Sequence, residues 1–548
     1  MKLSESFSET ESGGDSGELL NGCRRCKVRF FSLILSGKRT ENVKKKTVIS
    51  VFLRIFRVVV SDGFFILIPI FFKEVFLMEK LQEGLLSVVQ TINDYMADYV
   101  LIILLVGIGL YFTIKTRFVQ IRCFGEGMKK VFGGFSLKRK KDQNGISSFQ
   151  ALATAVAGQV GTGNIVGASG AILLGGPGAI FWMWIIAFLG MATIYAEAVL
   201  AQETRVVDAD GTVHGGPIYY IKRAFKGTFG KILAGFFAVA IVFSLGFIGG
   251  MVQSNSIGAT INTAFEIPTW ITGLVLSIVV GFIIIGGAKR IAATAEKIVP
   301  LMAVLYLVGG LIVLAVNITR VPAAFGLIFK LAFQPEALIG GTFGVAIKTA
   351  ISQGAKRGLF SNEAGMGSTP HAHALAEVKT PHEQGVVAMT GVFIDTFVVL
   401  TMTALVVITC TYTGNGAFVG MDSAAYSAAI ESGVINKTNI AQLSFGSVFG
   451  TWLGNAYVAI CLMFFAFTTI ISWNLFGKIN FNHLFGKKST IVYSIIAIVF
   501  VFAGTIVTEN ELVWLLQDTF NQFMVIPNAM ALIALAKIVK NASKGNKL

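Results

Sequence analysis

Apolar residues follow one another in runs of about 20 along most of the sequence, and polar residues gather in short segments between these runs. A helix of about 20 apolar residues is long enough to cross the hydrocarbon core of a bilayer. About eleven such runs follow Met78, so the pattern predicts an all-α polytopic membrane protein. The approximate cores are residues 98–114, 150–173, 178–202, 232–260, 268–287, 298–316, 340–375, 387–411, 448–476, 490–507 and 511–536.

The loops between these spans alternate in charge. Lys and Arg crowd every loop that follows an odd number of spans, such as 115–141 and 205–231, and also the tail from Lys537. The intervening loops are poor in them, as in 261–267 and 412–447. Because basic loops stay in the cytoplasm, a chain that starts at Met78 would have its N-terminus outside and its C-terminus inside the cell (inner or plasma) membrane.

Composition supports the membrane class. Of the 548 residues, 54% are hydrophobic and 14% are charged, whereas a soluble domain carries about 25% charged residues. The net charge of +15 could indicate a nucleic-acid partner, but the basic residues sit in alternate loops, and we expect no nucleic acid to bind. Cys23 and Cys26 form a single CxxC with no second pair nearby, which is weak support for a zinc site.

Residues 1–77 do not share the pattern of the rest. Their apolar stretch, Val51–Phe72, is interrupted by three charged residues and would make a poor spanning helix. Lys73–Val75 can be encoded by codons that contain a ribosome-binding sequence, and Met78 follows at a suitable spacing. We therefore expect 1–77 to be a non-native or disordered extension, Met78 to be the true start, and 78–548 to form the membrane-spanning domain.

The second predicted span has an interruption at its middle. Four glycines lie within Gly158–Gly167, together with the polar residues Gln159, Thr162 and Asn164. Such residues are poor helix formers, and an unwound turn at mid-membrane is tolerated only where its backbone groups line a polar cavity or bind a ligand. Close packing of small residues against a neighbouring helix is an equally good explanation.

A second interruption lies within Ser352–Ser368, five spans later and in a span of opposite direction. Two interrupted helices in corresponding positions of two halves indicate an inverted-repeat transporter. The break could fall at Ser352–Gly354 or at Phe360–Asn362. Three charged residues in the same stretch leave a polar loop as the alternative.

Further polar residues lie inside other spans. Gln253–Asn255 falls in the fourth predicted span, and Thr468 and Thr469 fall in 448–476. Adjacent threonines either bond back to their own helix or offer hydroxyl oxygens to a hard cation. Glu197 and Asp395 are carboxylates within spans, which makes each a candidate functional group or a helix-pairing group.

Several of these segments resemble the alanine or glycine:cation symporter family, also called sodium:alanine symporters. The resemblance runs from Met78 to the C-terminus and rests on five segments in order. These are Gly161–Asn164, Gly175–Trp182, Tyr195–Ala201, Gly215–Tyr220 and Gly358–Ser368. The resemblance implies a leucine-transporter-like fold, with a five-plus-five inverted repeat of discontinuous helices and one extra N-terminal helix.

The same resemblance implies positions for two sodium ions. Asn164 would face one ion beside the substrate. A second ion would lie between the carbonyls of Ala157 and Val160 and the hydroxyls of Thr468 and Thr469. No cofactor is implied, because sodium serves as the coupling ion.

The resemblance also implies the substrate pocket. The amides at Thr162 and Gly163 would meet the substrate carboxylate, and Trp473 would be a wall that keeps the pocket small. The remaining residues of the implied pocket are Gln253, Phe360, Ser361 and Asn362.

These observations predict a sodium-coupled symporter that imports alanine, glycine or both by alternating access, and not an enzyme. The alternatives are another small neutral amino acid, such as serine or glutamine, or coupling to protons, for which Glu197 is the group to test. A membrane-embedded enzyme is less favoured because the sequence has no nucleophile–base pair, zinc motif or phosphate loop. A channel is less favoured because two breaks of opposite direction are typical of a carrier.

Overall fold

The structure, a computed structural model, describes residues 79–133, 146–208, 213–340, 342–507 and 511–544. The chain divides into two units, Met1–Gly84 and Leu85–Leu548. The predictions for residues 1–77 and for Cys23 and Cys26 lie outside the described residues. Everything below concerns the second unit, apart from the first residues of helix α4.

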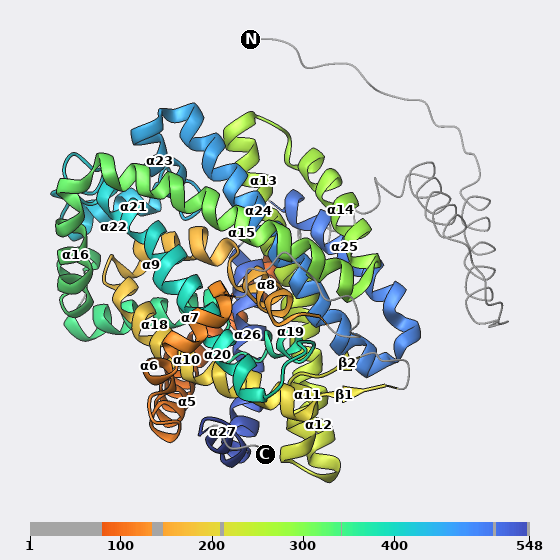
Figure 1. Ribbon diagram of the computed structural model, residues 1–548. Coiled ribbons are helices and arrows are strands. Elements are labelled where there is room, and N and C mark those ends of the chain that lie inside the picture. The colour runs from red at the N-terminus through yellow and green to blue at the C-terminus, as the bar shows by residue number, and fades with distance from the viewer. Residues whose placement is uncertain (1–78, 134–145, 209–212, 341, 508–510, 545–548) are drawn as a thin grey trace, which may run out of the picture. The chain divides into compact units, whose positions relative to one another are not determined.

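Helices make up nearly all of the described structure (Figure 1). Up to the middle of the chain they are α4 (Glu79–Tyr95), η1 (Met96–Leu101), α5 (Ile102–Lys115), α6 (Val119–Arg122), α7 (Phe124–Gly133), α8 (Ser148–Gln159), η2 (Gly163–Gly167), α9 (Ala168–Gly175), α10 (Ala179–Thr204), α11 (Pro217–Ala224), α12 (Gly227–Ile241), η3 (Val242–Ile248), α13 (Gly249–Phe265), α14 (Thr269–Ile285) and α15 (Gly287–Val316).

The second half continues with η4 (Ile318–Arg320), α16 (Val321–Phe333), α17 (Glu336–Ile339), α18 (Phe343–Asn362), α19 (Pro370–His373), α20 (Pro381–Val392), η5 (Phe393–Leu400), α21 (Thr401–Thr411), α22 (Ser423–Glu431), α23 (Ile440–Phe449), α24 (Thr451–Phe485), η6 (Lys487–Ser489), α25 (Thr490–Ile506), α26 (Glu511–Ala534) and α27 (Ala536–Ala542). One short antiparallel pair, β1 (Val206–Val207) with β2 (Val213–His214), lies in a loop.

The described residues contain seven helices that are long and apolar enough to cross a membrane, and up to eight if the pair Glu511–Ala534 and Ala536–Ala542, bent by 65°, counts as one span. The three other predicted spans do not meet this criterion of length and apolar character. Those at 150–173 and 340–375 are interrupted, and Thr269–Ile285 has only 17 residues. The protein is therefore a multi-pass membrane protein, and the predicted eleven spans are compatible with this arrangement.

The segment 412–447, predicted as a loop, contains the helix α22 and most of α23. α23 ends at Phe449; the next residue, Gly450, has a φ of 84°, and α24 packs back against α23 after this turn. Gly454 allows the close approach, because a Cβ there would lie 2.3 Å from the Gly446 nitrogen. Ten residues are too few to span a bilayer, which is why no spanning run marks α23 in the sequence.

The Lys- and Arg-rich loops contact one another and the C-terminal segment. Arg122 donates to the Ser543 carbonyl over 2.7 Å, and Lys487 pairs with Asp208 over 2.8 Å. Figure 1 shows α11, α12, the two short strands and α27 toward the same end of this unit. The basic segments that make these contacts therefore lie together, as the alternation of charge predicts.

Candidate functional site

The first predicted break is present in the structure. α8 begins with a capping box, in which Ser147 accepts from the Gln150 amide while Gln150 accepts from the Ser147 amide. It ends at Gln159, because Val160 has a non-helical ψ of 88°. The chain then resumes as the π-helical η2 and as α9. The backbone therefore opens at Val160–Thr162, within the glycine-rich segment that predicted it.

The second break lies at the later of the two predicted positions. α18 runs without interruption through Ser352–Gly354 and ends at Asn362, so the earlier position is wrong. The next residue, Glu363, adopts a left-handed backbone with φ of 58°. A residue other than glycine in this region is strained, and such strain concentrates at functional sites.

The two breaks meet in space although about 200 residues separate them. Gln159 donates its side-chain amide to the Asn362 carbonyl over 2.8 Å. A Cβ at Gly163 would lie 3.0 Å from both the Phe360 ring and the Ser361 Cα, so the glycine helps the two segments to approach this closely. The ends of the two broken helices therefore form one polar region inside the protein.

Asp395 connects the two breaks from a third segment, the π-helical η5. Its carboxylate accepts from the Asn164 side-chain amide over 2.6 Å, from the Ser361 hydroxyl over 3.1 and 3.0 Å, and from the Thr396 hydroxyl over 2.8 Å. The Asp395 side chain is fully buried, and no Lys or Arg of the described residues forms an ion pair with it. A buried carboxylate without a cation is costly, so this position calls for a bound cation or a proton.

Asp395 is absent from the residue set that the family resemblance implies. The signal that could have added it is its position inside a predicted span, which marked it as a candidate functional carboxylate. Asn164 lies at the first break, where its Oδ1 accepts from the Gly161 amide over 3.0 Å and its Nδ2 donates to Asp395 over 2.6 Å, and its role at a sodium ion stays a prediction. Asn164 thus holds the unwound turn and faces the carboxylate.

A second group of oxygens surrounds Thr469. Its hydroxyl oxygen lies 2.8 Å from the Ala157 carbonyl, 3.4 Å from the Val160 carbonyl and 3.0 Å from the Phe465 carbonyl. A hydroxyl has one hydrogen to donate, so the remaining contacts are between oxygens. Carbonyls released by a helix break together with a hydroxyl are ligands that suit a hard cation.

Thr468 points elsewhere. Its hydroxyl donates to the Phe465 carbonyl over 2.9 Å, within its own helix, and lies 3.4 Å from the Met302 sulfur. The structure therefore brings Thr469 to the released carbonyls and leaves Thr468 in the back-bonded arrangement that adjacent threonines often adopt.

Gln253 reaches the first break from α13. Its Oε1 accepts from the Thr162 amide over 3.1 Å, so that amide is already bonded. Two other buried polar atoms at this place, Gln253 Nε2 and the Thr162 hydroxyl, have no partner in the described part of the chain. Buried polar groups are normally hydrogen-bonded, so two unpartnered buried polar atoms on residues that already contact each other indicate a place for a polar ligand group.

Aromatic rings enclose this region. The Phe360 ring lies 5.8 Å from Trp473, edge to face, and 5.2 Å from Trp514. The Trp473 indole nitrogen donates to the Glu363 carboxylate, which also accepts from the Ser368 hydroxyl. The predicted wall residue Trp473 is thereby fixed to the segment that follows the second break.

A buried ion pair lies one turn before Phe360. Arg357 donates to both carboxylate oxygens of Asp518, over 3.3 and 2.9 Å, and its guanidinium lies 5.2 Å from the centre of the Trp514 ring. The Lys437 ammonium covers the same ring at 4.5 Å. These charged groups lie next to the aromatic enclosure.

Glu197 belongs to a different network. Its carboxylate accepts from the Asn528 side-chain amide over 2.5 Å and from the Gly365 amide over 3.3 Å. Asn528 accepts in turn from the Tyr220 hydroxyl. Glu197 therefore holds α10 and α26 to the segment after the second break, and it makes none of the contacts around Asn164 or Thr469.

Comparisons with known proteins identify the family of this chain. The family model described as the sodium:alanine symporter family matches residues 82–546. The sodium/alanine symporter AgcS of Methanococcus maripaludis is 40% identical over 459 residues, which cover 84% of this chain and 96% of AgcS. A putative sodium/proton-dependent alanine carrier protein of Bacillus subtilis, YrbD, is 41% identical over 82% of this chain and 90% of its own length.

Two further similar proteins are a second symporter relative and a solved structure. The probable sodium/glutamine symporter GlnT of Bacillus subtilis is 39% identical over 85% of this chain and 91% of its own length. The crystal structure of MhsT in complex with L-phenylalanine matches with a TM-score of 0.50 and 14% identity, covering 74% of this chain and 98% of MhsT. This second likeness concerns the fold alone, and it agrees with the leucine-transporter-like architecture.

Proposed function

The chain belongs to the sodium:alanine symporter family, and we propose that it imports alanine and glycine together with sodium by alternating access. Family membership makes it a transporter rather than an enzyme. The observation that carries the proposal is the Asp395 carboxylate, which holds side chains from both broken helices and has no cationic partner in the described structure. A sodium ion would supply the missing charge.

We propose two sodium positions. The first lies at Asp395, with Asn164 and Ser361 as neighbouring oxygen-bearing side chains. The second lies at the released carbonyls of Ala157 and Val160 beside the Thr469 hydroxyl. The support is the same in both cases, because each place gathers hard oxygen donors at a point where a helix is unwound.

The substrate carboxylate would bind next to these ions at Gln253 Nε2 and the Thr162 hydroxyl, the two buried donors without partners. The apolar side chain would then face Phe360 and Trp473. Two large rings at this place would restrict the size of the substrate side chain, which would favour alanine and glycine over bulkier substrates. Serine and glutamine remain the alternatives, the latter because GlnT is a relative.

The orientation follows from charge. The mutually contacting basic loops would face the cytoplasm, which puts the C-terminus inside and the protein in the cell membrane. Arg357 and Asp518 would then lie on the outer side of Phe360, because α18 would run from outside to inside.

One sodium ion per substrate gives enough driving force. A zwitterion adds no net charge, so each ion moves one charge, worth about 2.3 kcal/mol at 100 mV. A tenfold sodium gradient adds about 1.4 kcal/mol, and the sum of about 3.7 kcal/mol supports accumulation of about 500-fold. A second ion would raise this ratio further.

The test is transport by the full chain in proteoliposomes. Radiolabelled alanine uptake is measured with an inward sodium gradient, an inward proton gradient or neither. We expect uptake with sodium alone, lost in Asn164→Ala and kept in Asn317→Ala, whose side chain bonds to its own helix. Uptake driven by protons alone would reject the sodium assignment and point to Asp395 or Glu197 as the proton carrier. No alanine or glycine uptake under any gradient would reject the substrate assignment.

A further inference from the structure

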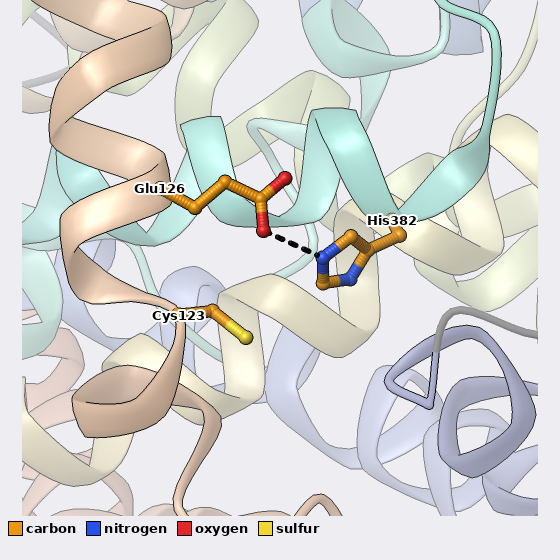
Figure 2. A group of neighbouring side chains, drawn as sticks. All are labelled: Cys123, Glu126 and His382. Carbon is orange, nitrogen blue, oxygen red and sulfur yellow. Dashed lines mark hydrogen bonds and ion pairs between the residues drawn. The ribbon is translucent and has the colours of Figure 1, made fainter.

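Three side chains of metal-binding types converge at a place that shares none of the contacts described at the helix breaks. Cys123 lies between α6 and α7, Glu126 lies one turn further along α7, and His382 is the second residue of α20. The Cys123 sulfur, a Glu126 carboxylate oxygen and a His382 ring nitrogen all lie within 4.8 Å of one another. Figure 2 shows the three side chains pointing toward one common space.

Neighbouring contacts orient the ligands. The Tyr195 hydroxyl lies 2.7 Å from His382 Nδ1, and Glu126 lies 3.2 Å from His382 Nε2. Because a hydroxyl can accept as well as donate, Tyr195 can hold the ring with its proton on Nδ1 and leave Nε2 available. Such a partner on the second ring nitrogen is what metal-bound histidines usually have.

The helices α7 and α20, which carry Glu126 and His382, are closely packed. A Cβ at Gly127 on α7 would lie 2.4 Å from the Thr390 hydroxyl and 2.7 Å from the Val386 carbonyl, both on α20. The backbones of α7 and α20 are therefore in close contact beside the cluster. The Lys130 ammonium lies 3.9 Å from the Glu126 carboxylate and 3.5 Å from that of Glu383. If Glu126 binds a metal ion, Lys130 can still pair with Glu383.

The three side chains suit zinc, a divalent cation that binds sulfur, nitrogen and oxygen ligands. One thiolate, one imidazole and one carboxylate are all common zinc ligands, and three protein ligands leave a fourth position to water. In a tetrahedral zinc site the donor atoms stand about 3.3–3.6 Å apart, so these three must close by at most about 1.5 Å. The thiolate and the carboxylate together balance the two charges of the ion, and binding releases the thiol proton.

We propose that Cys123, Glu126 and His382 form a zinc site on the side of the basic loops, which fastens α7 to α20. The proposal does not depend on the transported substrate, because it concerns a place outside the transport site. Its position is nonetheless relevant to transport, because α20 continues into η5, the segment that carries Asp395.

The test uses the full chain purified in detergent, with Cys23→Ser and Cys26→Ser as the background because that CxxC could itself hold a metal. Zinc chloride is titrated by calorimetry, and cobalt(II) serves as a spectroscopic probe. We expect one zinc per chain and a thiolate-to-cobalt charge-transfer band. Cys123→Ser should abolish the band and weaken zinc binding about 100-fold or more, and His382→Gln should weaken it similarly.

Matched controls separate the site from general metal affinity. Cys410→Ser and His214→Gln should bind zinc as the background protein does, although His214 is also paired with a carboxylate, Asp208. Tyr195→Phe keeps all three ligands and should weaken zinc binding about tenfold, which tests the site with no ligand changed. Size-exclusion profiles check that each variant is folded.

Two results would overturn the proposal. The first is a background protein that binds no zinc, which would leave the cluster as an ion pair between His382 and Glu126 only. The second is zinc binding that persists unchanged in Cys123→Ser and His382→Gln, which would place the metal elsewhere.

Discussion

Asp395→Asn replaces the buried carboxylate with a neutral group of the same shape. The asparagine Oδ1 can still accept from Asn164, and its amide can donate to the Ser361 and Thr396 hydroxyls, because hydroxyls accept as well as donate. The side-chain network is therefore retained, and we expect the variant to fold. What disappears is the negative charge that would face a sodium ion.

The expected loss of sodium affinity follows from the burial of Asp395. Removing one partner of a buried, hydrogen-bonded charge pair costs about 2–5 kcal/mol. At about 1.4 kcal/mol for each factor of ten, the sodium half-saturation concentration of alanine uptake should rise about 30-fold to several thousandfold. Uptake at fixed low sodium falls correspondingly, whereas the maximal rate at very high sodium should recover in part.

The assay is alanine uptake into proteoliposomes as a function of sodium concentration, together with the thermal stabilisation of the detergent-purified protein by sodium. Glu197→Gln is the matched control, because it also removes a fully buried carboxylate but lies in the network of Asn528 and Gly365. Its sodium half-saturation should stay within about threefold of that of the parent protein. If Asp395→Asn also stays within that range, Asp395 does not face the ion and the reasoning fails.

Three further substitutions test neighbouring contacts. Thr469→Val removes a hydroxyl oxygen from the released carbonyls and should raise the sodium half-saturation about 10- to 150-fold, whereas Thr468→Val should change it little; equal effects would contradict this placement. Gly161→Ala puts a Cβ 2.4 Å from the Thr469 hydroxyl and should weaken sodium activation of uptake about 5- to 150-fold, and unchanged activation would show that the two segments can separate. Arg357→Gln leaves Asp518 buried without its partner and should lower the free energy of unfolding by about 3–5 kcal/mol in thermal denaturation, and addition of Asp518→Asn should restore part of that loss.

The arrangement of spans and the first break could be predicted from the sequence because both follow from local composition. Apolar length decides which segments can cross a bilayer, and a cluster of glycines decides where a helix opens. The helical state of Ser352–Gly354 could not be predicted in this way. The two charged side chains that follow this segment form ion pairs with residues remote in the sequence, Lys356 with Asp94 and Arg357 with Asp518. The helix can therefore continue through them.

The composition of the site was harder to predict for the same reason. Asp395 is 231 residues from Asn164, and no local pattern indicates that the two side chains meet. The two threonines are adjacent and chemically identical, and only the rotation of α24 decides that Thr469 and not Thr468 reaches the carbonyls of α8. Residue type therefore indicated which polar groups lie at the breaks, and tertiary packing decided which of them meet.

The contacts of Asp395 also suggest how ion binding would be coupled to movement. Asp395 lies on η5, and its bonded neighbours Asn164 and Ser361 lie on η2 and α18. Three separate elements therefore meet at this carboxylate. A ligand can shift a conformational equilibrium only by the difference in its affinity for the two states. A sodium ion held by groups from all three elements binds well only when the two broken helices and η5 lie together. Sodium binding would therefore favour the state in which the substrate pocket between the breaks is assembled, and separation of these helices would release both.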